Sequence, residues 1–406
     1  MTTFHFQGGA LLHRLLWVKT LRSFADGYVS LLLPVYLLAL GMSPFQVGVI
    51  TTGTLLGSGV LTLLLGQHAW RFQYRSMLLG ASLLMAATGF GFAGITAFWP
   101  LLLIAVVGTL NPSGGDVSVF LPLEHAVLAN AVQAKERTAA FARYSMLGTL
   151  VAAIGALCAG LPVLAAQALP IDPLLAMQAM FLLYGVLGLV AAALYGTLPR
   201  TAAPVVRTRA APLRKAKKTV CTLAILFSLD AFGGGFVGQS MVALWLFQKY
   251  QLSVVMAGTI FFWTGICSAI SYLLAVRIAG RFGLLNTMVF SHLPANVLLV
   301  LVPFMPSLGW AIALLLARSM LSQMDVPTRS SFVMAVVPPE ERVAAASITA
   351  VPRSLVAACS PLLAGLMLGA STFGWPLLAA GSCKIVYDLL LLGLFRNVAL
   401  PEEVPE

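Results

Sequence analysis

Residues 15–40 read LLWVKTLRSFADGYVSLLLPVYLLAL, an apolar run with a single carboxylate, Asp26, near its middle. A membrane-spanning helix needs about 20 mostly apolar residues, and runs of that length recur as far as the C-terminus. Of the 406 residues, 60% are hydrophobic and only 9% are charged, whereas soluble domains are about a quarter charged. The sequence therefore predicts an all-α integral membrane protein that crosses the bilayer many times.

Turn residues and charge clusters divide the chain into twelve predicted transmembrane helices. The first is expected to be retained rather than cleaved as a signal peptide, because a second span follows at once and no small-residue cleavage site is present. The approximate bounds are 15–40, 45–66, 76–95, 98–122, 138–165, 174–197, 219–247, 254–276, 284–303, 307–328, 343–370 and 375–396.

Basic residues gather on alternate loops, and this asymmetry predicts the orientation. Positively charged loops stay in the cytoplasm, so both termini are expected to be cytoplasmic, in a cell (inner) membrane. The net charge of +11 follows from these loops, which favours contact with membrane lipid and not with nucleic acid. The basic positions on this side are Arg14, Lys19, Arg22, Arg71, Arg75, Lys135, Arg137, 200–218, Arg277, Arg281, Arg342 and Arg396, and only Lys249 lies on the other side.

The stretch 200–218 combines proline, alanine and basic residues without apolar periodicity, which is typical of a flexible linker. It predicts an N-terminal six-helix bundle over 1–199 and a C-terminal six-helix bundle over 219–406. Landmarks in the two halves repeat in the same order at an offset of about 205 residues. The pairs are Asp26 and Asp230, Arg71-Arg75 and Arg277-Arg281, Asp116 and Asp325, and Glu136-Arg137 and Glu341-Arg342.

With this duplication, the chain resembles the major facilitator superfamily over essentially its whole length. GQHAWRFQYR (66–75) keeps Gly66, Arg71 and Arg75 of the family's loop signature, but Trp70 stands where that signature has an aspartate. The stretch SQMDVPTRSSFVMAVVPPEER (322–342) looks like that of bacterial members. The resemblance implies two pseudo-symmetric bundles, a central cavity lined by helices 1, 4, 7 and 10, and alternating access for a small-molecule substrate. We expect a monomer.

Charged groups inside the bilayer are functional candidates, because each costs several kcal/mol to insert. Every helix that would line the cavity carries one aspartate: Asp26, Asp116, Asp230 and Asp325. Asp26 and Asp230 lie near the middle of their helices, where a carboxyl group withdrawn from water binds a proton readily. They are predicted to couple transport to protons or to contact the solute; the alternative is that they only bond a neighbouring helix.

Asp116 and Asp325 lie near the cytoplasmic ends of their helices, beside the basic loops. They are expected to pair with Arg71, Arg75, Arg277 or Arg281 and so to latch the inner gate. The repeated acid-base pairs are assigned to the same gate. These are Glu136, Arg137, Glu341 and Arg342.

Further candidates for solute or proton contact are Arg318, Arg353, Gln239, and His292 with Asn296 four residues later. Helix 7 contains DAFGGGFVGQS (230–240), whose glycines indicate either a break that exposes backbone groups or close helix packing. Lys384 and Asp388 stand four residues apart in helix 12 and are expected to neutralise each other.

The sequence has no GxxxxGK[ST] loop, no HExxH and no paired cysteine spacing, so we expect no ATP-driven pump, no enzyme, no cofactor and no metal. The leading hypothesis is a proton-coupled secondary transporter, with export favoured because deep carboxylates could exchange a proton for a cationic or amphipathic solute. The first alternative is a carrier of an anionic metabolite held by Arg318, Arg353 or His292. The second is a non-transporting receptor on a transporter scaffold, and an intramembrane enzyme is a weaker one.

Overall fold

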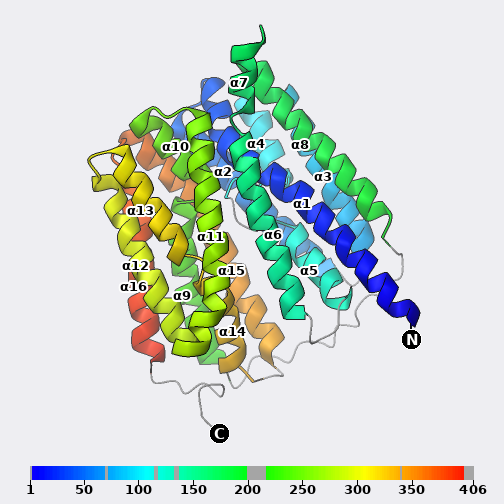
Figure 1. The fold of residues 1–406 in the computed structure, drawn as a ribbon, viewed down its shortest axis with the longest axis vertical. Helices are drawn as coiled ribbons and strands as arrows, with labels where there is room; N and C mark the ends of the chain where they lie inside the picture. The colour runs from blue at the N-terminus through cyan, green and yellow to red at the C-terminus, as the bar shows by residue number, and fades with distance from the viewer. Residues whose placement is uncertain are drawn as a thin grey trace.

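The computed structural model describes residues 2–68, 72–113, 118–131, 137–198, 216–338 and 341–396. These residues form helices joined by short connections, and none of them forms a strand (Figure 1). The first half contains α1 (Thr2–Ala39), α2 (Pro44–His68), α3 (Tyr74–Gly94), α4 (Phe98–Val107), α5 (Phe120–Ala131), α6 (Arg137–Cys158), α7 (Leu161–Ala168) and α8 (Pro173–Gly196).

The second half contains α9 (Lys217–Phe236), α10 (Gln239–Tyr250), α11 (Val254–Phe282), α12 (Leu284–Leu301), the 3-10 turn Val302–Phe304, α13 (Leu308–Leu321), α14 (Asp325–Val336), α15 (Arg342–Ala370) and α16 (Trp375–Phe395). Helix α1 begins and α16 ends at the same end of the molecule (Figure 1), which we call the terminal end. The domain boundaries stay a prediction, because 199–215 lie outside the described residues.

Ten helical segments of the described chain are long and apolar enough to cross a membrane. The two predicted spans missing from that set, 98–122 and 307–328, are each broken near the middle. The first divides into α4 and α5, and the second into α13 and α14. Together with the ten long segments, these two broken passes account for the twelve predicted spans, and the breaks fall at equivalent places in the two halves.

The seventh predicted span, 219–247, is also broken. This helix 7 corresponds to α9, which ends at Phe236, and α10, which begins at Gln239. Its glycines serve both purposes that the sequence left open. A Cβ on Gly235 would overlap the Ala357 carbonyl oxygen, so α9 and α15 approach each other through a position that only glycine can occupy.

Four hydrogen bonds to backbone carbonyls join the break in helix 7 to the N-terminal half. The Gln239 N–H donates to the Ser113 carbonyl at 3.1 Å, and the Ser240 N–H donates to the Pro112 carbonyl at 3.1 Å. The Ser240 hydroxyl lies 2.5 Å from the Ser30 carbonyl oxygen, with Pro112 O at 2.8 Å. Polar backbone groups released by two broken helices therefore satisfy one another across the two bundles.

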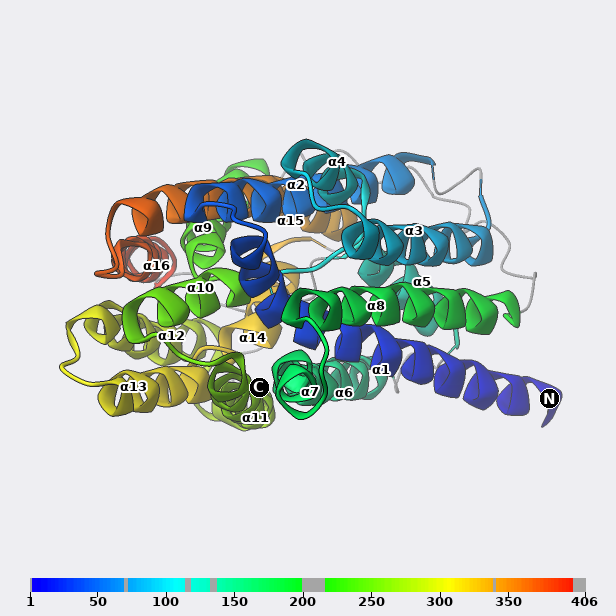
Figure 2. The same ribbon diagram turned by 90° about the horizontal axis from the view of Figure 1, so that it is seen from above.

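The two bundles also meet where α2 packs against α15 and α6 packs against α11 (Figure 2). A Cβ on Gly48 would lie 2.5 Å from the Pro361 carbonyl oxygen, and one on Gly258 would lie 2.7 Å from that of Ala156. These approaches involve the start of α2 with the end of α15, and the end of α6 with the start of α11. The tight contacts that the structure shows between the bundles thus lie away from the terminal end (Figure 1).

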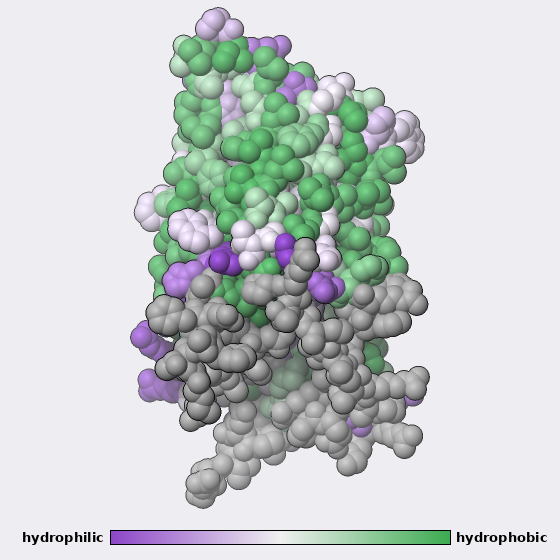
Figure 3. Space-filling model, turned by 90° about the vertical axis from the view of Figure 1, so that its right-hand side faces the viewer, coloured by the Kyte–Doolittle hydropathy of each residue, from purple (hydrophilic) through white to green (hydrophobic). Residues whose placement is uncertain are grey.

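Apolar side chains cover much of the described surface, as one face shows (Figure 3). Exposed leucines and valines of α8, such as Leu182, Val186 and Leu189, belong to this surface, as expected for helices that contact lipid.

Two of the basic residues that were counted on the cytoplasmic side are buried. Lys19 and Arg22 are 4% and 2% exposed and lie inside α1, which begins at Thr2 and is longer than the predicted span. Their charges therefore contribute to a buried network and not to a loop.

Candidate functional site

Each half contains a buried polar network, and the two networks differ in how completely they are satisfied. In the N-terminal half, Arg22 forms an ion pair with Glu124 at 2.6 Å and donates to the Ser118 hydroxyl at 2.9 Å. The Tyr144 and Tyr195 hydroxyls donate to the same Glu124 carboxylate. A carboxylate with an arginine and two tyrosines around it is saturated, so this network holds α1, α5, α6 and α8 together.

This network was not predicted from the sequence. The available signal was the spacing of Lys19, Arg22 and Asp26, which at i, i+3 and i+7 share one face of a helix. Glu124 had no such signal, because it lies beyond the predicted end of its span.

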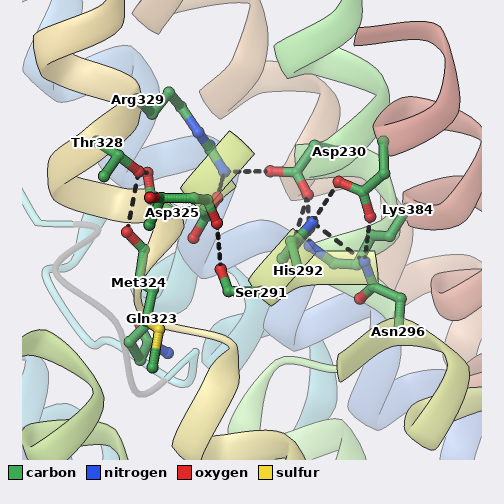
Figure 4. A network of polar contacts seen from close by, with 12 residues as sticks. Asp230, Ser291, His292, Asn296, Gln323, Met324, Asp325, Thr328, Arg329 and Lys384 are labelled. Atoms are coloured by element: carbon green, nitrogen blue, oxygen red, sulfur yellow. Dashed lines mark hydrogen bonds and ion pairs between the residues drawn. The ribbon is translucent and has the colours of Figure 1, made fainter. Parts of the chain in front are cut away.

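The network of the C-terminal half is centred on Asp230 of α9, which is 3% exposed (Figure 4). Its Oδ1 lies 2.6 Å from the Lys384 ammonium group, and its Oδ2 lies 2.9 Å from an Arg329 nitrogen. Arg329 also pairs with Asp325, one turn earlier in α14. Three carboxylate and cation pairs thereby connect α9, α14 and α16.

His292 of α12 extends this network to a third carboxylate, Asp388 of α16. The His292 Nδ1 lies 2.8 Å from the Asp388 Oδ1, and the Asn296 amide donates to the other Asp388 oxygen at 2.9 Å. The His292 Nε2 faces Asp230 Oδ1 at 3.7 Å. His292 is therefore flanked by two buried carboxylates that belong to different helices.

A cavity of ≈ 150 Å³ opens beside Asp230. Its walls carry four permanent cations, Arg318, Arg329, Arg353 and Lys384, against two carboxylates, Asp230 and Asp325. With a neutral His292, the lining has a surplus of two positive charges. Guanidinium nitrogens are left over as well, since Arg318 Nε and both Nε and Nη1 of Arg329 are buried without a hydrogen-bond partner among the described residues.

The break in helix 10 shapes this cavity. Arg318 lies in the last turn of α13, Asp325 and Arg329 lie in the first turns of α14, and Ser322 and Gln323 of the connecting turn line the wall. Arg353 reaches the same space from α15 and is exposed. A cavity with these charged and polar walls can therefore bind a small charged solute that enters the protein.

A family model described as Major Facilitator Superfamily matches residues 15–318. The chain belongs to the major facilitator superfamily. It is 23% identical over 421 residues to the uncharacterized membrane protein YJR124C of Saccharomyces cerevisiae, with 95% of this chain and 94% of the yeast protein covered. This relative gives no support to the bacterial subgroup expected from 322–342. As a member of this superfamily, the chain is a secondary transporter of a small solute and not an enzyme.

Solved structures of transporters share the fold. The nucleoside transporter NupG matches with a TM-score of 0.70 at 15% identity, covering 95% of this chain and 99% of that one. A bacterial homolog of the human lysosomal transporter Spinster, inward-facing and occupied, gives 0.74 at 16% identity, with 96% of each chain covered. A D-xylose-proton symporter gives 0.70 at 17% identity, covering 96% and 98%.

Within this major facilitator fold, the structure brings several predicted site residues together. Asp230, Arg318, His292 and Arg353 line one cavity, and Asn296 orients the Asp388 carboxylate behind it. Cations on other helices surround Asp230, and its position within its own helix did not predict them.

Two predicted site residues lie elsewhere. Asp26 is half-buried in α1, outside the lining of this cavity. Gln239 lies at the start of α10, where its backbone N–H joins the two halves.

The predicted gate partners differ from those observed. Asp325 pairs with Arg329, and Arg277 and Arg281 are exposed on α11, so the expected pairing of Asp325 with those two arginines was wrong. Arg75 donates to the Gly196 carbonyl at the end of α8.

Glu341 is buried and accepts a hydrogen bond of 3.0 Å from the Ala216 N–H, which ties the start of α9 to the start of α15. Arg71, Asp116 and Glu136 lie outside the described residues, as do the side chains of Arg137 and Arg342. A gating role for these residues stays a prediction.

The expected pairing of Lys384 with Asp388 was also wrong. Although they are four residues apart on α16, Lys384 binds Asp230, and Asp388 binds His292 and Asn296. Each finds a better-placed partner on a neighbouring helix, and helix spacing alone could not reveal this.

Proposed function

We propose that this transporter carries a small anionic solute together with a proton, and that the anion binds in the cavity of the C-terminal half. The observation that supports this most directly is the charge of the lining, in which four cations face two carboxylates. A positive cavity inside a low-dielectric membrane protein attracts anions and repels cations strongly.

Arg318 and Arg353 are the groups that would hold the anion. Lys384 and Arg329 are already paired with Asp230, whereas neither Arg318 nor Arg353 has an ion pair with another described residue. A guanidinium group matches a carboxylate or phosphate with two parallel hydrogen bonds. The two arginines approach the cavity from α13 and α15. An anion bound between them would therefore bridge two helices of the C-terminal half.

This proposal keeps proton coupling from the leading hypothesis and takes its solute from the first alternative. The expectation of export depended on a cationic or amphipathic solute exchanged for a proton. An anion that is carried together with a proton instead moves the same way as the proton, which runs down its gradient.

Thermal unfolding of the purified protein in detergent would test anion binding directly. Succinate, lactate and inorganic phosphate serve as anionic probes, and choline and tetraphenylphosphonium serve as cationic ones. We expect an anion, and neither cation, to raise the midpoint of unfolding, because a ligand that binds only the folded state stabilises it.

Arg318→Ala should abolish this stabilisation, and Arg318→Lys should keep part of it, because lysine retains the charge and loses the paired geometry. Arg277→Ala is the matched control, since Arg277 is an exposed arginine of α11 away from the cavity lining. Stabilisation by the cations, or by anions in Arg318→Ala to the same degree as in the wild type, would overturn the proposal.

A further inference from the structure

His292 has a position in the network that the anion site does not require. Its ring lies between Asp388 of α16, at 2.8 Å from Nδ1, and Asp230 of α9, at 3.7 Å from Nε2. His292 is 4% exposed, Asp388 is fully buried and Asp230 is 3% exposed. An imidazole enclosed in this way by two carboxylates is positioned to bind and release a proton.

The short contact between His292 and Asp388 fixes one proton. Two bare acceptors would repel each other at 2.8 Å, so a hydrogen lies between Nδ1 and the Asp388 Oδ1. The Asn296 amide nitrogen lies 3.1 Å from the same Nδ1 and 2.9 Å from the second Asp388 oxygen, and with Nδ1 protonated it donates to that oxygen. In this tautomer the position whose occupancy can change is Nε2, which faces Asp230.

The contacts of Asp388 show what an Nε2 proton would do. Its two oxygens contact His292 and Asn296, and it forms no ion pair with a lysine or arginine among the described residues. The cations of the cavity lie instead around Asp230 and Asp325. A second proton on His292 would place a positive charge beside Asp388, where a lone buried carboxylate is otherwise costly.

The groups around His292 explain how this proton could be exchanged. Lys384 and the His292 Nε2 both face Oδ1 of Asp230, at 2.6 and 3.7 Å, so they compete for one oxygen. Other charged or titratable groups near the ring are Tyr387 and Asp388 of α16, Arg318 of α13, and Asp325 and Arg329 of α14, while Arg277 and Arg281 of α11 are exposed. A movement that brings Lys384 closer to Asp230 would favour proton release, and one that withdraws it would favour proton binding.

We propose that His292 is the proton-binding residue of this transporter, holding the coupling proton on Nε2 between Asp230 and Asp388 while the anion occupies Arg318 and Arg353. The inference rests on the proposed proton-coupled function. It selects one of the candidates for proton contact that the sequence offered, which were His292 and the carboxylates Asp26 and Asp230. The proton and the anion then occupy adjacent sites on the same half of the molecule.

Nitrogen-15 NMR of the full chain in lipid bilayers, labelled at its five histidines, would report the state of this ring without any transported solute. Subtracting the spectrum of His292→Gln isolates the His292 signals. At about pH 6 we expect both ring nitrogens to be protonated, and raising the pH should remove the proton from Nε2 alone. A ring with a bare Nε2 throughout this range would overturn the proposal, whether or not an anion is carried.

Transport measurements separate a proton-binding role from a structural one. In proteoliposomes supplied with succinate, lactate or phosphate, His292→Gln should lose accumulation driven by a pH gradient but keep exchange of anion for anion. A structural role would instead lower both activities together, and that result would overturn the proposal.

The pH dependence gives a second readout. Asp388→Asn removes a negative charge that holds the imidazolium, so the pH at which accumulation falls to half should decrease. His13→Gln, at an exposed histidine of α1, is the matched control and should leave this pH unchanged. An unaltered pH midpoint in Asp388→Asn would count against the assignment. If no anion exchanges at all, the proposed function fails, and the NMR result still decides the state of His292.

Discussion

At the scale of single residues, the two buried networks differ in how many of their hydrogen-bond donors and acceptors are already used. This difference separates a structural role from a binding role. Glu124 accepts hydrogen bonds from one arginine and two tyrosines, which leaves it little capacity to bind anything else. Around Asp230, by contrast, guanidinium nitrogens of Arg318 and Arg329 remain without partners among the described residues, next to a cavity. Unused donors beside a cavity inside a membrane protein are groups that a solute can bind.

The ion pair between Asp230 and Lys384 makes a stability prediction. Lys384→Met leaves the Asp230 Oδ1 buried without its closest cation, while Arg329 still contacts Oδ2. It should lower the free energy of unfolding by up to about 3–5 kcal/mol, the cost of removing one partner of a buried ion pair. Thermal unfolding in detergent measures this as a lower midpoint.

The double variant Asp230→Asn with Lys384→Met should recover much of the loss, because both charges are then removed. A double variant less stable than Lys384→Met would show that the two residues do not form a coupled pair.

From the sequence, these residues could be placed within membrane-spanning helices, but their pairing could not be predicted. Asp230 and Lys384 are 154 positions apart, and no spacing rule connects helices so distant in the chain. Spacing along one helix was even misleading for Lys384 and Asp388. By contrast, the single face shared by Lys19, Arg22 and Asp26 was readable from the sequence, and it was overlooked because the two basic residues were counted only as orientation signals.

At the scale of elements, broken helices shape the cavity and join the two halves. The glycines of helix 7 indicated either a break, since glycine weakens a helix interior, or close helix packing, and the structure contains both. The break in helix 4 contains Asn111 and Pro112, which favour a turn, but it was hidden within a long apolar span. The break in helix 10 occurs at Ser322, Gln323 and Met324. Pro327 was the local signal for it, because a proline cannot donate to the carbonyl four residues earlier, at Gln323, and this signal was overlooked.

Gly48 tests the contact between α2 and α15. Its Cβ would lie 2.5 Å from the Pro361 carbonyl oxygen and 3.0 Å from the Gly365 Cα, so Gly48→Ala must push the two helices apart. We expect the bundles to separate more often at the end opposite the terminal end. Spin labels at Ser43 and Thr372, in a background without the five native cysteines, should then report longer distances.

Gly369→Ala is the control on the same helix, because a Cβ there meets nothing within 4 Å. It should leave the distances unchanged. Equal distance distributions in Gly48→Ala and the wild type would show that this contact does not hold the bundles together.

At the scale of the whole molecule, the bundles meet tightly at one end, and the charged cavity lies within the C-terminal half. Hydrophobic content and loop charge predicted an all-helical membrane protein of twelve passes, and the internal repeat predicted its family. Alternating access then requires the contacts of Gly48 and Ser240 to break while the solute stays bound. An anion that neutralises Arg318 and Arg353 would lower the cost of that movement, since the cavity no longer carries surplus charge through the membrane.

Solute accumulation in proteoliposomes under an imposed pH gradient tests the central claim, that surplus positive charge in the C-terminal cavity selects an anion. With radiolabelled succinate, lactate and phosphate offered beside choline and tetraphenylphosphonium, the account predicts accumulation of an anion that depends on the gradient and is lost in Arg318→Ala. Accumulation of the cations alone, or anion accumulation that survives Arg318→Ala and Arg353→Ala together, would contradict it.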